Sequence, residues 1–130
     1  MSTPEPFDSR SFRFACDIVN IYRLLIELPE MPHAIARQLL RLGTSIGANL
    51  TEAKGAQTRP DSAARFTIAL KEARETQYWL RLIIATKLAR SVDLTSTLRE
   101  ATELVAILTV AARNLRKSKG SKSTEENRRG

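Results

Sequence analysis

Cysteine, histidine and aromatic residues are scarce in this sequence of 130 residues. Cys16 is the only cysteine and His33 the only histidine, which excludes an intrachain disulfide and a Cys/His cluster for zinc. Di-iron helical bundles need histidines spaced from glutamates on inward helix faces, whereas His33 follows Pro32 in an expected turn. We therefore expect a non-enzymatic protein without metal or cofactor, in which Cys16 is an inert apolar filler on a helix.

Two pairs of glutamates at positions i and i+3 are the remaining residues that could share a metal. They are Glu72 with Glu75 and Glu100 with Glu103. Without a histidine partner, such pairs are more typical of solvated or salt-bridged helix faces. A metal-dependent enzyme is therefore the least favoured hypothesis.

Long apolar runs are also missing. No run approaches the roughly 20 residues of a membrane-spanning helix, and residues 1–6 lack the basic start and apolar middle of a secretory signal. We therefore expect a cytoplasmic protein with no membrane partner. Leu, Ile and Ala carry most of the apolar content, and this composition favours helices over sheets.

Apolar residues recur at alternating spacings of four and three, which is typical of helices in a bundle. The pattern predicts helices over about 9–28, 32–54, 60–89 and 95–116. Their connections are shorter than about eight residues, which favours an antiparallel up-down-up-down four-helix bundle spanning 9–116. Residues 1–8 are expected to be a mobile arm and residues 117–130, which contain no apolar residue, a disordered basic tail. The predicted apolar stripe of the third helix consists of Phe66, Leu70, Ala73, Leu80 and Ile84.

The second helix contains residues that an ordinary helical core does not need. Gly43 and Gly47 lie one turn apart, and each costs about 1 kcal/mol relative to alanine inside a helix, so another backbone should come close there. Asn49 falls in a gap of the apolar stripe. A buried amide without partners costs about 1–3 kcal/mol, so we expect Asn49 to be hydrogen-bonded, with Ser45 and Glu52 on the same strip.

The third helix is apolar nearly all round between residues 78 and 85, which one amphipathic face does not require. Exposed apolar surface of that size usually marks a subunit contact. The expected oligomer interface consists of Tyr78, Trp79, Leu82 and Ile83.

The net charge of +7 lies mainly at the end of the chain. Residues 1–112 contain 14 Lys and Arg against 12 Asp and Glu, whereas residues 113–130 contain 7 against 2. Taken singly, the bases of the bundle are ordinary solvated charges, but a ring of identical subunits would repeat them around its axis as a band that tracks phosphates. The expected nucleic-acid-binding residues are Arg37, Arg41, Lys71, Arg74, Arg81, Arg116 and Lys117.

Three runs carry a family resemblance: Ser-Ile-Gly-Ala-Asn-Leu-Thr-Glu-Ala at 45–53, Ile-Ala-Leu-Lys-Glu-Ala at 68–73 after Phe66, and Glu-Thr-Gln-Tyr-Trp-Leu at 75–80. The chain resembles the four-helix-bundle proteins encoded within intervening sequences of bacterial large-subunit ribosomal RNA, and the related accessory variability proteins of diversity-generating retroelements. The resemblance implies a ring-shaped homopentamer, nucleic acid binding and, in the retroelement branch, association with a reverse transcriptase. The matching signature positions are Ser45, Ile46, Asn49, Glu52 and Glu75, with Glu72 added to the expected polar network.

Two hypotheses about function follow. The first is a non-enzymatic homo-oligomer that binds RNA or DNA through a symmetric basic surface. The alternative is a structural or protein-protein adaptor oligomer that binds no nucleic acid.

Overall fold

The computed structural model describes the backbone of residues 5–129 and the side chains of residues 5–117. Four helices make up the fold: α1 (Phe7–Leu25), α2 (His33–Lys54), α3 (Arg59–Ala85) and α4 (Thr95–Arg129). Within residues 5–129 there is no strand, so the predicted all-α class with four helices is confirmed. Over this part of the chain, none of the helices has the length and apolar content required to span a membrane.

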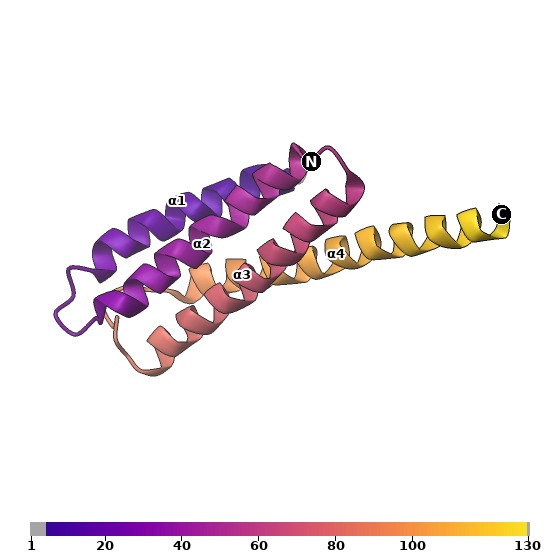
Figure 1. Cartoon of the computed structure of the whole chain (residues 1–130). Coiled ribbons are helices and arrows are strands. Elements are labelled where there is room, and N and C mark those ends of the chain that lie inside the picture. The colour runs from indigo at the N-terminus through magenta and orange to yellow at the C-terminus, as the bar shows by residue number, and fades with distance from the viewer. Residues whose placement is uncertain (1–4, 130) are drawn as a thin grey trace.

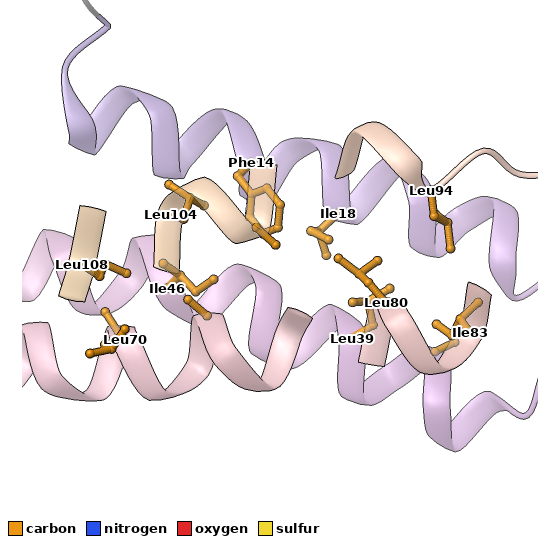
Figure 2. Packing of buried hydrophobic residues seen from close by; sticks show 14 of the residues in the cluster. Phe14, Ile18, Leu39, Ile46, Leu70, Leu80, Ile83, Leu94, Leu104 and Leu108 are labelled. Carbon is orange, nitrogen blue, oxygen red and sulfur yellow. The ribbon is translucent and has the colours of Figure 1, made fainter. Parts of the chain in front are cut away.

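Each helix packs against the next one along the chain, and α1 also has a small contact with α4. The C-terminal part of α4 extends well beyond the other three helices (Figure 1). All four helices, with the loop residues Met31 and Ala89 and the residue preceding α4, Leu94, contribute to one apolar core. Figure 2 shows its centre, where Phe14 and Ile18 of α1 face Leu104 of α4 and Leu80 of α3.

The close approach of another backbone predicted at the two glycines of α2 is confirmed at Gly47, whereas at Gly43 the close atoms belong to a side chain. A Cβ atom built on Gly43 would lie 2.8 Å from the Cγ1 atom of Ile18, and one built on Gly47 would lie 3.3 Å from the carbonyl oxygen of Ser11. Both partners belong to α1 and are buried. The glycines therefore allow α1 and α2 to pack closely, which offsets their cost in helix propensity.

The buried face of α3 differs from the predicted stripe. Ile84 is 41% exposed, and Phe66 is only partly buried. The buried residues are Ala69, Leu70, Ala73, Thr76, Leu80 and Ile83. Small or polar residues occupy part of this face and contribute little to the apolar periodicity. The periodicity therefore did not locate the buried face correctly. Thr76 is tolerated there because its hydroxyl donates to the carbonyl oxygen of Glu72 at 2.7 Å.

Helix α3 ends at Ala85 rather than at residue 89. Thr86 is its C-cap, and Lys87 follows with a φ of 60°. The amide of Leu88 donates to the carbonyl of Ile83 at 3.2 Å, and the amide of Lys87 donates to that of Ile84 at 3.1 Å. These two bonds form a Schellman motif, which ends a helix with a residue in the left-handed conformation. Here a lysine occupies the position where glycine is usual, so the sequence carried no stop signal.

The ends of the chain also differ from the prediction. Helix α1 begins at Phe7, inside the expected arm of residues 1–8, and residues 1–4 of that arm lie outside the described residues. It ends at Leu25, three residues before the predicted end. Helix α4 continues to Arg129 through the tail expected to be disordered. Between Leu115 and Arg129 there is no proline, and lysine, arginine and glutamate are good helix formers, so no residue there forces the helix to stop.

Candidate nucleic-acid interface

A polar network joins α2 to α3 around Asn49. The half-buried side chain of Asn49 donates to the carbonyl oxygen of Ser45 at 3.1 Å and to the Glu72 carboxylate at 3.2 Å. Its own side-chain oxygen accepts from the Arg65 guanidinium at 3.3 Å. The prediction that Asn49 is hydrogen-bonded is confirmed, but the predicted partner Glu52 is wrong. Glu52 is exposed, and the carboxylate opposite Asn49 belongs to the neighbouring helix, which spacing along one helix cannot reveal.

The environment of Glu72 perturbs its ionisation. Burial raises the pKa of its carboxyl, and the hydrogen bond from Asn49 and the positive charge of Arg41 act in the opposite direction. The neighbouring charges of Glu75 and Lys71 also act on this carboxyl, so five of the predicted site residues, Glu72 included, gather at the α2–α3 junction. Ser45 completes the junction on α2, where its hydroxyl donates to the carbonyl of Arg41 at 2.6 Å.

Replacing Glu72 by glutamine is expected to stabilise the protein at neutral pH. Because the folded-state pKa is raised, Glu72 favours folding when it is protonated, and this contribution is lost as the pH rises through the folded-state pKa. Glutamine is always neutral and keeps an oxygen that accepts from Asn49. The free energy of unfolding should rise by less than about 1 kcal/mol at pH 7, and the gain should shrink at pH 4. Urea unfolding at both pH values measures it.

The matched control is Glu27→Gln, which removes an exposed carboxylate from the turn after α1. This control should show no such gain. An equal or larger gain at pH 4 would contradict the interpretation of Glu72.

Three of the predicted basic residues share one outward strip of α3. We call Lys71, Arg74 and Arg81 the basic strip; all three are exposed. Tyr78 lies on the same face, since positions 71, 74, 78 and 81 follow the spacing of three and four that one helix face requires. The ion pairs of the described side chains involve none of these three bases. Their charges are therefore available to a partner.

Most of the excess charge of the bundle lies in and just after α3. Residues 63–90 contain six Lys and Arg against two Asp and Glu, and the two acids, Glu72 and Glu75, are half-buried. All six bases are exposed: Arg65, Lys71, Arg74, Arg81, Lys87 and Arg90. Arg65, Lys87 and Arg90 were not predicted as part of the site, because the charge of the bundle was compared only with that of the tail. A count of charge along each helix would have found them.

The other predicted basic residues are exposed but lie elsewhere. Arg37 and Arg41 are on α2, and Arg41 donates to the side chain of Gln38 at 3.0 Å. Arg116 and Lys117 are on α4, beyond Ala112, the last buried residue among the described side chains of that helix. The structure therefore groups three of the predicted bases on α3, places Arg41 near them at the α2–α3 junction, and leaves Arg37, Arg116 and Lys117 as separate exposed charges.

The predicted oligomer interface is only partly at the surface. Tyr78 is 56% exposed, whereas Trp79 and Leu82 are half-buried and Trp79 packs against the core. Ile83 is completely buried among the residues of its own chain, so its assignment to an interface is wrong. The stretch is apolar all round because its inner face fills the core. Large apolar side chains are exposed on three helices: Phe12, Leu24, Ile68, Tyr78, Ile84 and Val110.

The second glutamate pair is salt-bridged, as expected. Arg10 of α1 donates to both Glu100 and Glu103 of α4, with Nη2 3.1 Å from Oε2 of Glu100. These carboxylates, Glu100 first, raise the pKa of the Arg10 guanidinium. Among the described side chains, no group of three His, Cys, Asp or Glu could hold a metal. Cys16 is exposed, so its assignment as a packed filler is wrong.

Comparisons with known proteins identify relatives over most of the chain. Residues 9–110 match the sequence profile of a family described as "23S rRNA-intervening sequence protein". The chain is also similar to a crystal structure described as a protein with unknown function from the S23 ribosomal protein family of Bacteroides thetaiotaomicron. The two are 39% identical over 81% of this chain and 96% of that chain, with a TM-score of 0.73. No curated protein matches the sequence.

Proposed function

This chain belongs to the 23S rRNA-intervening sequence protein family, and from that premise we propose that it is a non-enzymatic homo-oligomer that binds nucleic acid through the basic strip of α3. The observation that carries the proposal is the concentration of exposed bases between residues 63 and 90, where the only two acids are half-buried. Lys71 and Arg81 are ten residues apart, about 15 Å along a helix. That length is enough to face several phosphates of one strand.

Assembly would multiply this surface. The proposed assembly is a ring-shaped homopentamer of antiparallel up-down-up-down bundles, as the family resemblance implies. Apolar side chains left at the surface, such as Phe12 at 70% exposure, supply area that subunit contacts could bury. A ring repeats Lys71, Arg74 and Arg81 once per subunit, so weak contacts with phosphates add up. Arg37, Arg41, Arg116 and Lys117 are proposed as supporting contacts.

The resemblance to the retroelement accessory proteins adds a protein partner to the proposal. It rests on the signature positions Ser45, Ile46, Asn49, Glu52 and Glu75, of which Ser45, Asn49 and Glu75 lie at the α2–α3 junction. A reverse transcriptase would then be a second partner of the oligomer. Co-purification with the enzyme of a retroelement from the same genome tests this part separately.

Binding of a structured RNA, with a DNA duplex in parallel, is expected to weaken steeply as salt increases. Each neutralised phosphate contributes a slope of about −0.9 in a plot of log affinity against log salt for duplex DNA, so three bases per subunit predict a slope of about −3 or steeper. Fluorescence anisotropy of the labelled nucleic acid measures the slope, and light scattering of the same sample gives the mass.

This function would be rejected if the affinity did not depend on salt, or if an oligomer of several subunits bound no nucleic acid. Either result would favour a structural or protein adaptor oligomer. A mass of 14.5 kDa at micromolar concentration would reject the oligomer itself.

A further inference from the structure

We infer that Tyr78 is a platform on which an unpaired base stacks, so that the basic strip takes single-stranded RNA in preference to duplex. The inference rests on the proposed nucleic acid binding and names the form of ligand that α3 recognises. Tyr78 stands between Arg74 and Arg81 on the same exposed face and is itself 56% exposed. Surfaces that bind single strands combine an exposed aromatic ring, on which a nucleobase stacks, with positively charged side chains on either side that attract the phosphates.

The ring of Tyr78 is held in place by its neighbour. Its centroid lies 5.3 Å from that of Trp79, and the two ring planes meet at 79° in an edge-to-face arrangement. Trp79 is half-buried and packs against the core, so it is anchored. Tyr78 therefore gains support from a fixed side chain and keeps more than half of its own surface exposed to a ligand.

The chemistry of the strip favours unpaired bases. The three basic side chains, Lys71, Arg74 and Arg81, attract the phosphates of any nucleic acid. They therefore do not distinguish a single strand from a duplex. Bases inside a duplex already stack on each other and present only their edges, whereas an unpaired base offers a face to an aromatic ring. Only Tyr78 among these four residues can therefore distinguish a single strand from a duplex.

The single tryptophan of the chain provides the readout. The full-length protein is titrated with a 12-nucleotide oligouridylate and with an RNA duplex of the same length at low salt. Stacking on Tyr78 should change the fluorescence of the adjacent Trp79 in the single-strand titration and much less in the duplex titration. Tyr78→Ala should weaken single-strand binding about 10-fold and leave duplex affinity within about twofold, and Tyr78→Phe should retain wild-type affinity.

The control is Asn20→Ala, which shortens an exposed, uncharged side chain of α1 and should leave both affinities unchanged. The inference would be overturned if Tyr78→Ala lost affinity equally for single strand and duplex, or lost none. Salt-dependent binding of RNA by that variant would still support the proposed function. A changed oligomeric mass in Tyr78→Ala would assign the ring to a subunit contact and overturn it as well. If neither RNA binds the wild-type protein, both proposals fall.

Discussion

Replacing Gly43 by valine is expected to lower the free energy of unfolding by about 3 kcal/mol. The new Cβ atom would lie 2.8 Å from Cγ1 and 3.0 Å from Cγ2 of Ile18, closer than real Cβ contacts allow. Ile18 is completely buried, so it cannot turn into solvent to make room. The gain in helix propensity from glycine to valine is only a few tenths of a kcal/mol and does not offset the clash. Urea unfolding monitored by circular dichroism measures the loss.

Two companion variants show whether the clash with Ile18 is the cause. Gly47→Ala places its Cβ 3.3 Å from the Ser11 carbonyl, and the cost of this tight contact is offset by about 1 kcal/mol of helix propensity, so stability should change little. In an Ile18→Ala background, Gly43→Val should cause no further loss, because the clashing atoms are gone. Additive losses in the double variant would show that the close approach of α1 and α2 at Gly43 is not the constraint inferred.

Reversing the three charges of the basic strip is expected to weaken RNA binding roughly 100-fold or more near physiological salt. The triple variant Lys71→Glu, Arg74→Glu and Arg81→Glu removes three contacts with phosphates and adds three repulsive charges. All three side chains are exposed, so the fold should survive and the circular dichroism spectrum should stay unchanged. Anisotropy of a labelled RNA measures the loss, and the slope against log salt should fall by about 1 for each base removed.

A control with the same change in net charge separates position from total charge. Arg23, Arg99 and Arg113 are exposed bases of α1 and α4, and their reversal to glutamate changes the net charge by the same amount. This control variant should lose much less affinity than the strip variant. Equal losses in the two variants would mean that the overall charge attracts RNA and that α3 has no special role.

The sequence predicts much of this fold because its helices have strong apolar periodicity. Helix α2 was predicted within one residue at each end, and the close approach of another backbone at Gly47 was predicted from the cost of a glycine in a helix. The end of α3 was missed because Lys87 takes the left-handed conformation that normally requires glycine. The helical continuation of α4 was missed because apolar periodicity carries no information about a segment whose sequence contains no apolar residue.

The candidate site was less predictable, because it depends on which residues of different helices lie opposite each other. The need for a partner at Asn49 follows from the cost of an unsatisfied amide, but its partner Glu72 is 23 residues away on another helix. Ile84 was assigned to the core by a stripe misplaced by one position, and Ile83 to a subunit contact because residues 78–85 are apolar nearly all round. A shift of one residue turns a helix face by about 100°, which is enough to exchange a buried position for an exposed one.

The most direct test of whether nucleic acid lies on α3 is lysine modification. The reactivity of individual lysines with an amine-specific reagent is compared with and without bound RNA. Mass spectrometry of the modified peptides reports Lys54, Lys71 and Lys117 in one sample, and all three are exposed in the free protein. We predict that saturating RNA protects Lys71 and leaves the reactivity of Lys54 of α2, which pairs with Asp8 at 3.1 Å, unchanged. Full reactivity of Lys71 in the presence of bound RNA would contradict it.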